Sequence, residues 1–226
     1  MMSWKLIIDI GHTAFALPMA AAIAAWLIVG RSWKLAMYWC LMFGGGLVLV
    51  ALSKIAFLGW AVEIPALQFN ALSGHALCAS AVVPVLFFVA LQGSTDTWRL
   101  AGALAGGGVS VGLGVLLVYF NFHTASEVIA SLVLGTCISM GYIRIARSLP
   151  SPQLNRWAIP LSMLVFALVF SLKPATINHR LVDVALHLSG RDRPFKWPKR
   201  VLCGAPGQTA GQGQGMIMST GESIIA

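Results

Sequence analysis

Two short polar stretches hold the residues of this chain whose types and spacing could do chemistry. Ser73, Gly74 and His75 stand at the start of one apolar run, and His123 and Glu127 stand at the start of another. Only 10% of the 226 residues are charged, whereas 58% are hydrophobic. Ionisable groups at the ends of such apolar segments are costly to place, so they indicate a functional site.

His123 and Glu127 are four residues apart, the spacing that brings two side chains onto one face of an α-helix. The carboxylate could hold one imidazole nitrogen while the other points at a reacting atom, which makes the histidine a competent nucleophile or base. The structural alternative is a buried His–Glu pair whose side chains only satisfy each other's hydrogen-bonding groups. A metal site is disfavoured, because zinc takes three or four clustered ligands and the clearest additional candidate here is His75.

Ser73, Gly74 and His75 have the composition of an anion-binding helix start. A hydroxyl, an unhindered backbone and N–H groups at the positive end of a helix dipole suit a phosphate. An ordinary helix start with a histidine at the membrane interface is the alternative. Lys54 ends the preceding apolar run, where it could hold a phosphate oxygen or serve as an interfacial anchor.

The chain is predicted to be an all-α bundle of about six transmembrane helices. Apolar runs about as long as a bilayer core is thick recur along it, and the last of them is the shortest. These runs cover residues 13–30, 35–53, 76–92, 100–122, 124–143 and 157–172. Residues 55–72 are mixed in character and are expected to form an interfacial or re-entrant loop.

The basic residues act as topology determinants in this interpretation. The net charge is +8, but no nucleic-acid-binding module is visible, so nucleic acid is not an expected partner. Arginine and lysine cluster at 31–34, at Arg99 and at 144–156, and these clusters are predicted to face the cytoplasm. Residues 54–75 and 121–127 then share the opposite, non-cytoplasmic face, which brings the two polar stretches to one side of the membrane.

The chain divides into three predicted parts. Residues 1–172 form the transmembrane bundle, and residues 173–200 form a basic segment with an amphipathic helix over 176–188. Residues 201–226 are rich in Gly, Gln, Ser and Thr and are predicted to be disordered. The oligomeric state is left open.

The polar residues, taken together, resemble the motifs of the type 2 phosphatidic acid phosphatase superfamily, which is related in its site to vanadium haloperoxidases and bacterial acid phosphatases. The resemblance covers residues 54–141. Lys54 fits the lysine of the first motif, and Ser73-Gly74-His75 fits the second motif, with Leu72 where the family has proline. His123 and an acid four residues later fit the third motif, with glutamate for the commoner aspartate.

Both arginines of the family motifs are missing. Leu117 stands six residues before His123, where the third motif has arginine, and Leu116 stands where it has serine. Ala61 and Val62 occupy the Arg-Pro position of the first motif. Leucine cannot replace the two hydrogen bonds that an arginine guanidinium donates to a phosphate. The loss of one transition-state donor costs about two to three orders of magnitude in rate.

The resemblance implies a phosphatase that needs no metal and no other cofactor. His123 attacks phosphorus and forms a phosphohistidine, Glu127 fixes the tautomer of His123, and His75 protonates the leaving oxygen and then activates water. The phosphate oxygens are held by three further groups: Lys54, Ser73 and Gly74. Weak activity, a different substrate, or a cation from Arg191 or Arg193 are the alternatives that the missing arginines leave open.

The expected partners are membrane lipids, with an anionic lipid phosphate as substrate. Phosphatidate, a prenyl phosphate or pyrophosphate, or a lipid A phosphate would each suit a site at headgroup level. The expected location is a bacterial inner membrane, with the site facing the periplasm or exterior. Two alternatives remain: a pseudoenzyme that binds anionic headgroups without turnover, and a small proton-coupled transporter that uses His123 and Glu127 as a relay.

Overall fold

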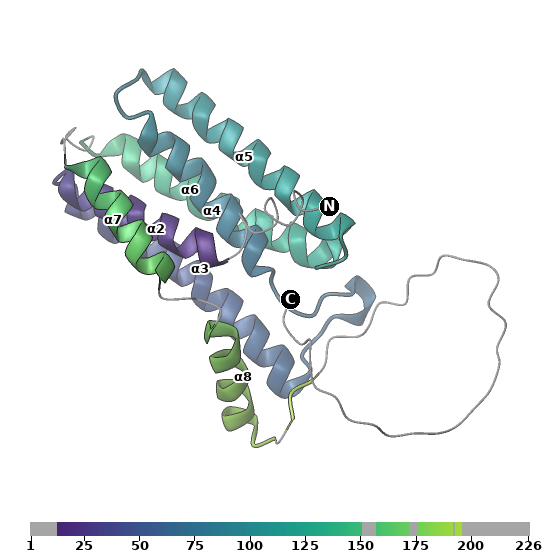
Figure 1. The fold of residues 1–226 in the computed structure, drawn as a ribbon. Coiled ribbons are helices and arrows are strands. Elements are labelled where there is room, and N and C mark those ends of the chain that lie inside the picture. The colour runs from purple at the N-terminus through teal and green to yellow at the C-terminus, as the bar shows by residue number, and fades with distance from the viewer. Residues whose placement is uncertain (1–12, 151–156, 172–175, 192, 196–226) are drawn as a thin grey trace, which may run out of the picture. The chain divides into compact units, whose positions relative to one another are not determined.

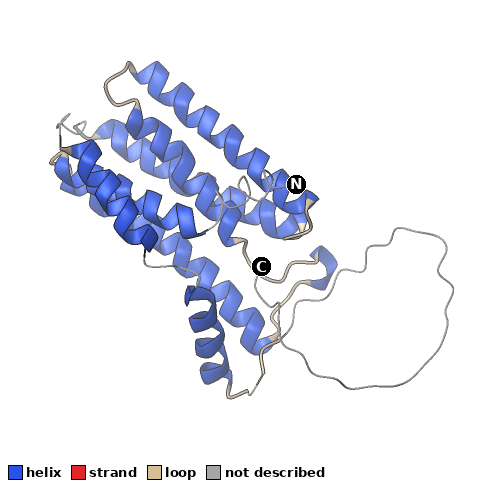
Figure 2. Cartoon of the chain, viewed as in Figure 1, coloured by secondary structure: helices blue, strands red, loops and turns tan. Residues whose placement is uncertain are grey.

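The computed structural model describes residues 13–150, 157–171, 176–191 and 193–195. Within these ranges the regular structure is helical (Figure 2), which confirms the predicted all-α class. The helices are α2 (Thr13–Val29), α3 (Trp33–Trp60), α4 (Gly74–Ala90), α5 (Asp96–Tyr119), α6 (Ala125–Ser148), α7 (Ala158–Ser171) and α8 (Thr176–Ser189). A short 3-10 turn, η1 (Pro65–Leu67), lies between α3 and α4.

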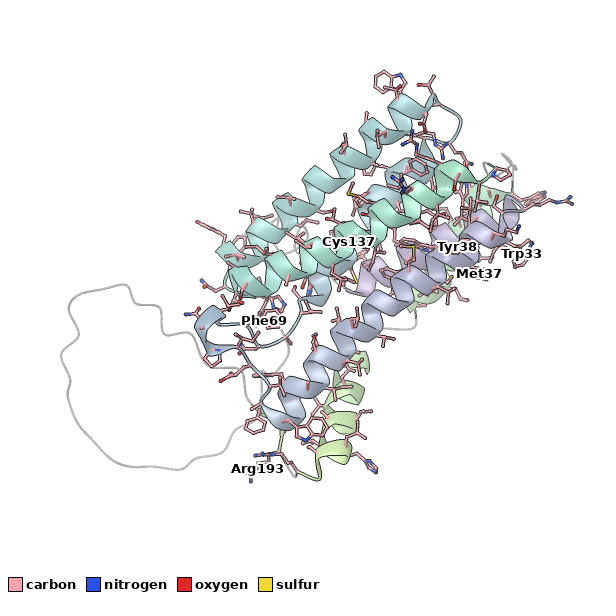
Figure 3. All side chains as sticks on the ribbon, turned by 180° about the vertical axis from the view of Figure 1, so that it is seen from behind. Trp33, Met37, Tyr38, Phe69, Cys137 and Arg193 are labelled. Carbon is pink, nitrogen blue, oxygen red and sulfur yellow. The ribbon has the colours of Figure 1, made fainter. Side chains whose placement is uncertain are left out.

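Three of the described helices, α3, α5 and α6, are long and apolar enough to cross a membrane. They have 28, 24 and 24 residues, against the roughly 20 that a span requires. Helices α2, α4 and α7 are apolar but shorter, so the expected total of six spans stays a prediction. Trp33 and Met37 project outward from the first turns of α3 (Figure 3), and Trp33 is 66% exposed, as side chains that face lipid are.

Helix α4 is the central helix of the described bundle. It packs against α2, α3, α5 and α6, and Figure 1 shows α5 and α6 running alongside it. Its residues are buried almost all the way round, as is typical of a helix inside a bundle. The residues at its N-terminal end are therefore held from several sides.

Helices α4 and α6 run parallel and start at the same end of the bundle. Ser73 and Ser131 meet near the start of both helices, and Ser80 meets Gly135 further along. A side chain at position 135 would run into Ser80 and the backbone of α4, so glycine allows the two helices to approach closely. This contact fixes the register that brings the two polar stretches together.

Helix α5 runs antiparallel to α4 and is joined to it by a buried hydrogen bond. The Ser110 hydroxyl donates to the Ala79 carbonyl at 2.9 Å. One turn earlier on α5, Gly106 lies against the backbone of Pro84, where a Cβ would not fit. The end of α5 is thereby placed beside the starts of α4 and α6.

The prediction that a helix ends at Lys54 is wrong. Helix α3 continues to Trp60, because residues 55–60 are almost wholly apolar and a single lysine does not end a helix. The helix ends at Ala61, which has a left-handed φ of 53°, with N–H groups of the cap turned back to the carbonyls of Ala56 and Phe57. The predicted loop therefore begins at residue 61, where it contains η1 and a β-bridge between Ile64 and Phe69.

The amphipathic helix predicted over 176–188 is confirmed as α8, which is followed by Gly190 in a left-handed conformation. It packs on α3, where Ala185 is fully buried and lies against Gly59. The Phe195 N–H also donates to the Leu58 carbonyl of α3 at 3.1 Å. The predicted disordered tail, 201–226, lies outside the described residues.

Candidate functional site

The two polar stretches lie together at one end of the bundle. The rings of His75 and His123 have their centroids 6.2 Å apart and are tilted by 55° to each other. His75 comes from the first turn of α4, and His123 precedes α6. A group between the two rings would be within reach of both imidazoles.

His123 and Glu127 form the pair that their spacing predicted, but in a different backbone setting. His123 Nδ1 lies 3.0 Å from Glu127 Oε2. Thr124 is the N-cap of α6, so His123 stands just outside the helix rather than on its face. The Thr124 hydroxyl accepts from the Glu127 N–H, and the Glu127 carboxylate accepts from the Thr124 N–H, each at 3.2 Å, which is a capping box.

The Glu127 carboxylate is buried and fully engaged. The residue is only 2% exposed, and besides its two contacts at Oε2 it accepts the Asn70 N–H at Oε1, at 3.2 Å. A buried carboxylate can only accept hydrogen bonds, so His123 Nδ1 carries the proton between them. In the neutral ring the lone pair then resides on Nε2, the nitrogen that a nucleophilic or basic histidine would use.

The start of α4 is tied to α6 through one serine. Ser73 is the N-cap of α4, and its Oγ accepts from the Ala76 N–H at 3.4 Å. The Ser73 N–H donates to Ser131 Oγ at 2.7 Å, and the Ser131 hydroxyl donates to the Glu127 carbonyl at 2.6 Å. Ser73 and Gly74 are buried, so a ligand would reach Ser73 only between the helix starts.

Lys54 joins this group from α3, although its helix runs on past it. The residue is half-buried and lies near enough to Glu127 for their charges to interact. Its neighbour Ser53 holds the loop in place, because Ser53 Oγ accepts from the Leu72 N–H at 3.1 Å and donates to the Val50 carbonyl at 2.8 Å. The structure thus brings Lys54, Ser73, Gly74, His75, His123 and Glu127 to one end of the bundle.

Leu117, at the position of the third-motif arginine, packs behind the site. It is 4% exposed and forms a small apolar cluster with Ala76 and Val128. Its carbonyl accepts from the His123 N–H at 3.4 Å, so the backbone of this residue also helps to place the histidine. A hydrocarbon side chain therefore occupies this position behind His123.

The other positions considered for a phosphate-binding arginine are Ala61, in the first motif, and the later residues Arg191 and Arg193. Ala61 caps α3 in a left-handed conformation. Arg191 lies over the ring of Phe195 with 4.1 Å between the guanidinium carbon and the ring centroid. The hypothesis that Arg191 or Arg193 serves the phosphate stays a prediction.

Three residues that organise the site were missed by sequence reasoning. They are Asn70, Thr124 and Ser131. Thr124 was detectable, because Thr-x-x-Glu before an apolar run is the signature of a capping box. Asn70 acts through its backbone N–H, a group that the side chain does not determine, so the residue type does not mark this position.

The described residues contain no group of three or more His, Cys, Asp or Glu side chains placed to hold a metal ion. No protein-family profile matches the chain, and no solved structure matches it. The chain is similar to a protein of Klebsiella pneumoniae described as an uncharacterized 22.5 kDa protein in the cps region. The two are 29% identical over 199 residues, which cover 86% of this chain and 95% of that protein.

Replacing Ser131 with alanine is expected to loosen the connection between the two helix starts. The Ser73 N–H would lose its acceptor while buried, at a cost of about 1–3 kcal/mol. We expect a lower apparent melting temperature in detergent and faster hydrogen exchange at the Ser73 amide. Ser148→Ala is the control, because that hydroxyl donates only to a carbonyl of its own helix near the other end of α6. Wild-type melting and an equally protected Ser73 amide in Ser131→Ala would contradict this description.

Proposed function

We propose that this protein is an integral membrane phosphatase that removes phosphate from a lipid phosphate or pyrophosphate through a phosphohistidine. The proposal also assigns it to the type 2 phosphatidic acid phosphatase superfamily, as a member without the motif arginines. The observation that carries it is the 3.0 Å contact between His123 Nδ1 and the buried Glu127 carboxylate, with the His75 ring 6.2 Å from that of His123. One oriented nucleophile and one acid facing it are the parts that a two-step phosphoryl transfer requires.

In the first step, His123 Nε2 attacks the terminal phosphorus of the substrate. A nitrogen–phosphorus bond forms, the bond from that phosphorus to the leaving oxygen breaks, and protonated His75 gives its proton to that oxygen. The leaving oxygen is the lipid oxygen of a lipid phosphate or the bridging oxygen of a pyrophosphate. Glu127 stabilises the positive charge that develops on the His123 ring, because its carboxylate already accepts from Nδ1. The products of this step are a phosphohistidine and either the dephosphorylated lipid or, from a pyrophosphate, the lipid monophosphate.

In the second step, neutral His75 takes a proton from a water molecule whose oxygen attacks the phosphorus. The nitrogen–phosphorus bond breaks, its electron pair returns to His123 Nε2, and inorganic phosphate leaves. His75 is again protonated and ready for the next substrate. Each histidine therefore ends the cycle in its starting state.

The phosphate oxygens would be held by Lys54, by the Ser73 hydroxyl and by N–H groups at the start of α4. The Ser73 hydroxyl accepts from Ala76, so its proton remains available to donate. The first N–H groups of a helix have no partner within the helix and lie at its positive end. These donors act without the two arginines of the family, so we expect a slow enzyme, by about two to three orders of magnitude for each lost donor.

The proposed setting is a bacterial inner membrane, crossed by about six helices, with the site at the periplasmic or exterior interface. The three helices that are long and apolar enough to cross a membrane support a membrane location. The distribution of arginine and lysine between the apolar runs supports the orientation. A site at headgroup level suits phosphatidate, prenyl phosphates and pyrophosphates, and lipid A phosphates alike.

A second candidate function is the binding of an anionic headgroup without turnover. The observation that favours it is Leu117, which is buried against Ala76 and Val128 at an arginine position of the family motif. In that case the helix start and Lys54 would hold the phosphate, and the histidine would not be phosphorylated.

The purified protein is expected to release inorganic phosphate from at least one member of a panel of lipid phosphates, in the presence of EDTA. His123→Ala should abolish release, because the nucleophile is gone. His187→Ala is the matched control, because His187 is exposed in the last turn of α8 and is no part of the site. Lipid association without release would favour the headgroup binder, and release that survives His123→Ala would contradict the proposed nucleophile.

Leu117→Arg is expected to raise turnover, because the guanidinium would add a charged donor behind His123. The substitution also places a charge in a buried apolar cluster, so the apparent melting temperature must be measured beside the rate. Leu117→Met, which keeps the volume, should leave both quantities close to wild type. A further drop in turnover by a folded Leu117→Arg protein would contradict the family assignment of this position.

A further inference from the structure

A groove of about 1110 Å³ lies between α5 and α6, toward the end of the bundle opposite the two histidines. Its floor includes Pro84 of α4, and its walls are residues of α5 and α6 at helical spacing. Both helices pack on α4, and near the histidine end Gly114 of α5 lies against Val128 and Leu132 of α6. The two helices therefore meet near the histidines, and the groove extends no nearer to them along α5 than Val111.

The end of the groove that is farther from the histidines is positively charged. Arg99, Arg144 and Arg147 line it together with Asp96, so three positive charges and one negative charge leave an excess of two. Asp96 is engaged by Arg147 through a 2.7 Å ion pair between half-exposed side chains. Asp96 also lies near enough to Arg99 for their charges to interact, but one carboxylate cannot neutralise three guanidinium groups, so positive charge is left to attract an anion.

Arg99 is the residue that points to a bound anion most directly. Its guanidinium lies over the Phe88 ring, 4.0 Å from the centroid, which orients it without neutralising it. Its Nε is buried and has no hydrogen-bond partner among the described residues. The side chain as a whole is only partly buried and lines the groove, where a phosphate oxygen is an acceptor that suits the geometry of a guanidinium.

The rest of the groove is mostly apolar, although Thr136, Ser139 and Ser148 also line it. Leu104 is 70% exposed and Met140 is 64% exposed, and both belong to helices long and apolar enough to cross a membrane. From Arg99 to Val111 the groove follows α5 over about 18 Å, at about 1.5 Å per residue. That length is comparable with one leaflet of a hydrocarbon core roughly 30 Å thick. Gly107, between them, has open space where a side chain would be.

We infer that this groove binds an anionic membrane lipid, with the lipid phosphate held by Arg99 and Arg144 and one acyl chain lying between α5 and α6. The arginines would bind the anionic headgroup, and the apolar walls would contact the acyl chain attached to it. Basic pockets between transmembrane helices commonly hold acidic lipid headgroups. This lipid site is separate from the proposed catalytic site and does not depend on turnover there.

The test is a titration of the purified full-length chain in nonionic detergent, with bound lipid counted by native mass spectrometry. Phosphatidylglycerol and phosphatidylcholine with identical acyl chains are the probes. We expect phosphatidylglycerol to bind about tenfold more tightly, because only its headgroup carries a net negative charge for the arginines. Equal binding of the two lipids would overturn the proposal.

Two sets of variants separate the headgroup from the acyl chain. Arg99→Gln combined with Arg144→Gln should lower phosphatidylglycerol binding to the level of phosphatidylcholine, whereas Arg31→Gln with Lys34→Gln, a charge-matched pair outside the groove, should not. Gly107→Leu should weaken the binding of both lipids by about fivefold, because the leucine side chain would occupy the space of the acyl chain and so remove its contact with the groove. Gly108→Leu should not weaken binding. Both glycine positions face open space, so neither leucine strains the fold, and only Gly107 lines the groove.

Three results would overturn the lipid assignment. One is wild-type phosphatidylglycerol binding by the double arginine variant. Another is wild-type lipid binding by Gly107→Leu, which would remove the acyl chain from the groove. The third is complete displacement of phosphatidylglycerol by an equal concentration of inorganic phosphate, which would make the arginines a site for free anions.

Discussion

The arrangement of this site depends on one buried carboxylate. Glu127 is almost inaccessible to solvent, so its two oxygens must find hydrogen-bond donors within the protein. They find them in the His123 ring, the Thr124 backbone and the Asn70 backbone. A single acid thus fixes the start of α6, the orientation of an imidazole and the end of the loop that leads into α4.

The hydrogen bonds of Ser131 extend this constraint to the second histidine. The Ser131 hydroxyl accepts a hydrogen bond from the Ser73 N–H and donates one to the Glu127 carbonyl. These two hydrogen bonds fix the start of α4 relative to the first turns of α6. Gly135 makes the same registration possible further along, because it admits Ser80 and the α4 backbone. Apolar packing is not directional and leaves the register of two helices loosely defined. The hydrogen bonds of Ser131 and Glu127 define that register and thereby place His75 and His123.

The sequence predicts which side chains of the site lie together better than it predicts the backbone around them. The four-residue spacing of His123 and Glu127 predicts their contact, yet the contact forms across an N-cap because Thr124, not the histidine, begins the helix. Lys54 was expected to end a helix because it is charged, but helix ends are set by backbone caps, and the left-handed Ala61 is a position that composition does not mark. Asn70 contributes a backbone N–H, and the groove at the other end combines residues of α5 and α6 that only three-dimensional packing brings together.

The central proposal is that His123 becomes phosphorylated. The most direct measurement is mass spectrometry of the peptide that contains His123, after the His75→Ala protein is mixed with a prenyl pyrophosphate and quenched under alkaline conditions. This substrate needs little help from an acid to leave, and without His75 the second step is slowed, so the intermediate should accumulate. We expect phosphate on His123 that decays with time. Phosphate release that proceeds with no modified His123, or phosphate on a different residue, would contradict it.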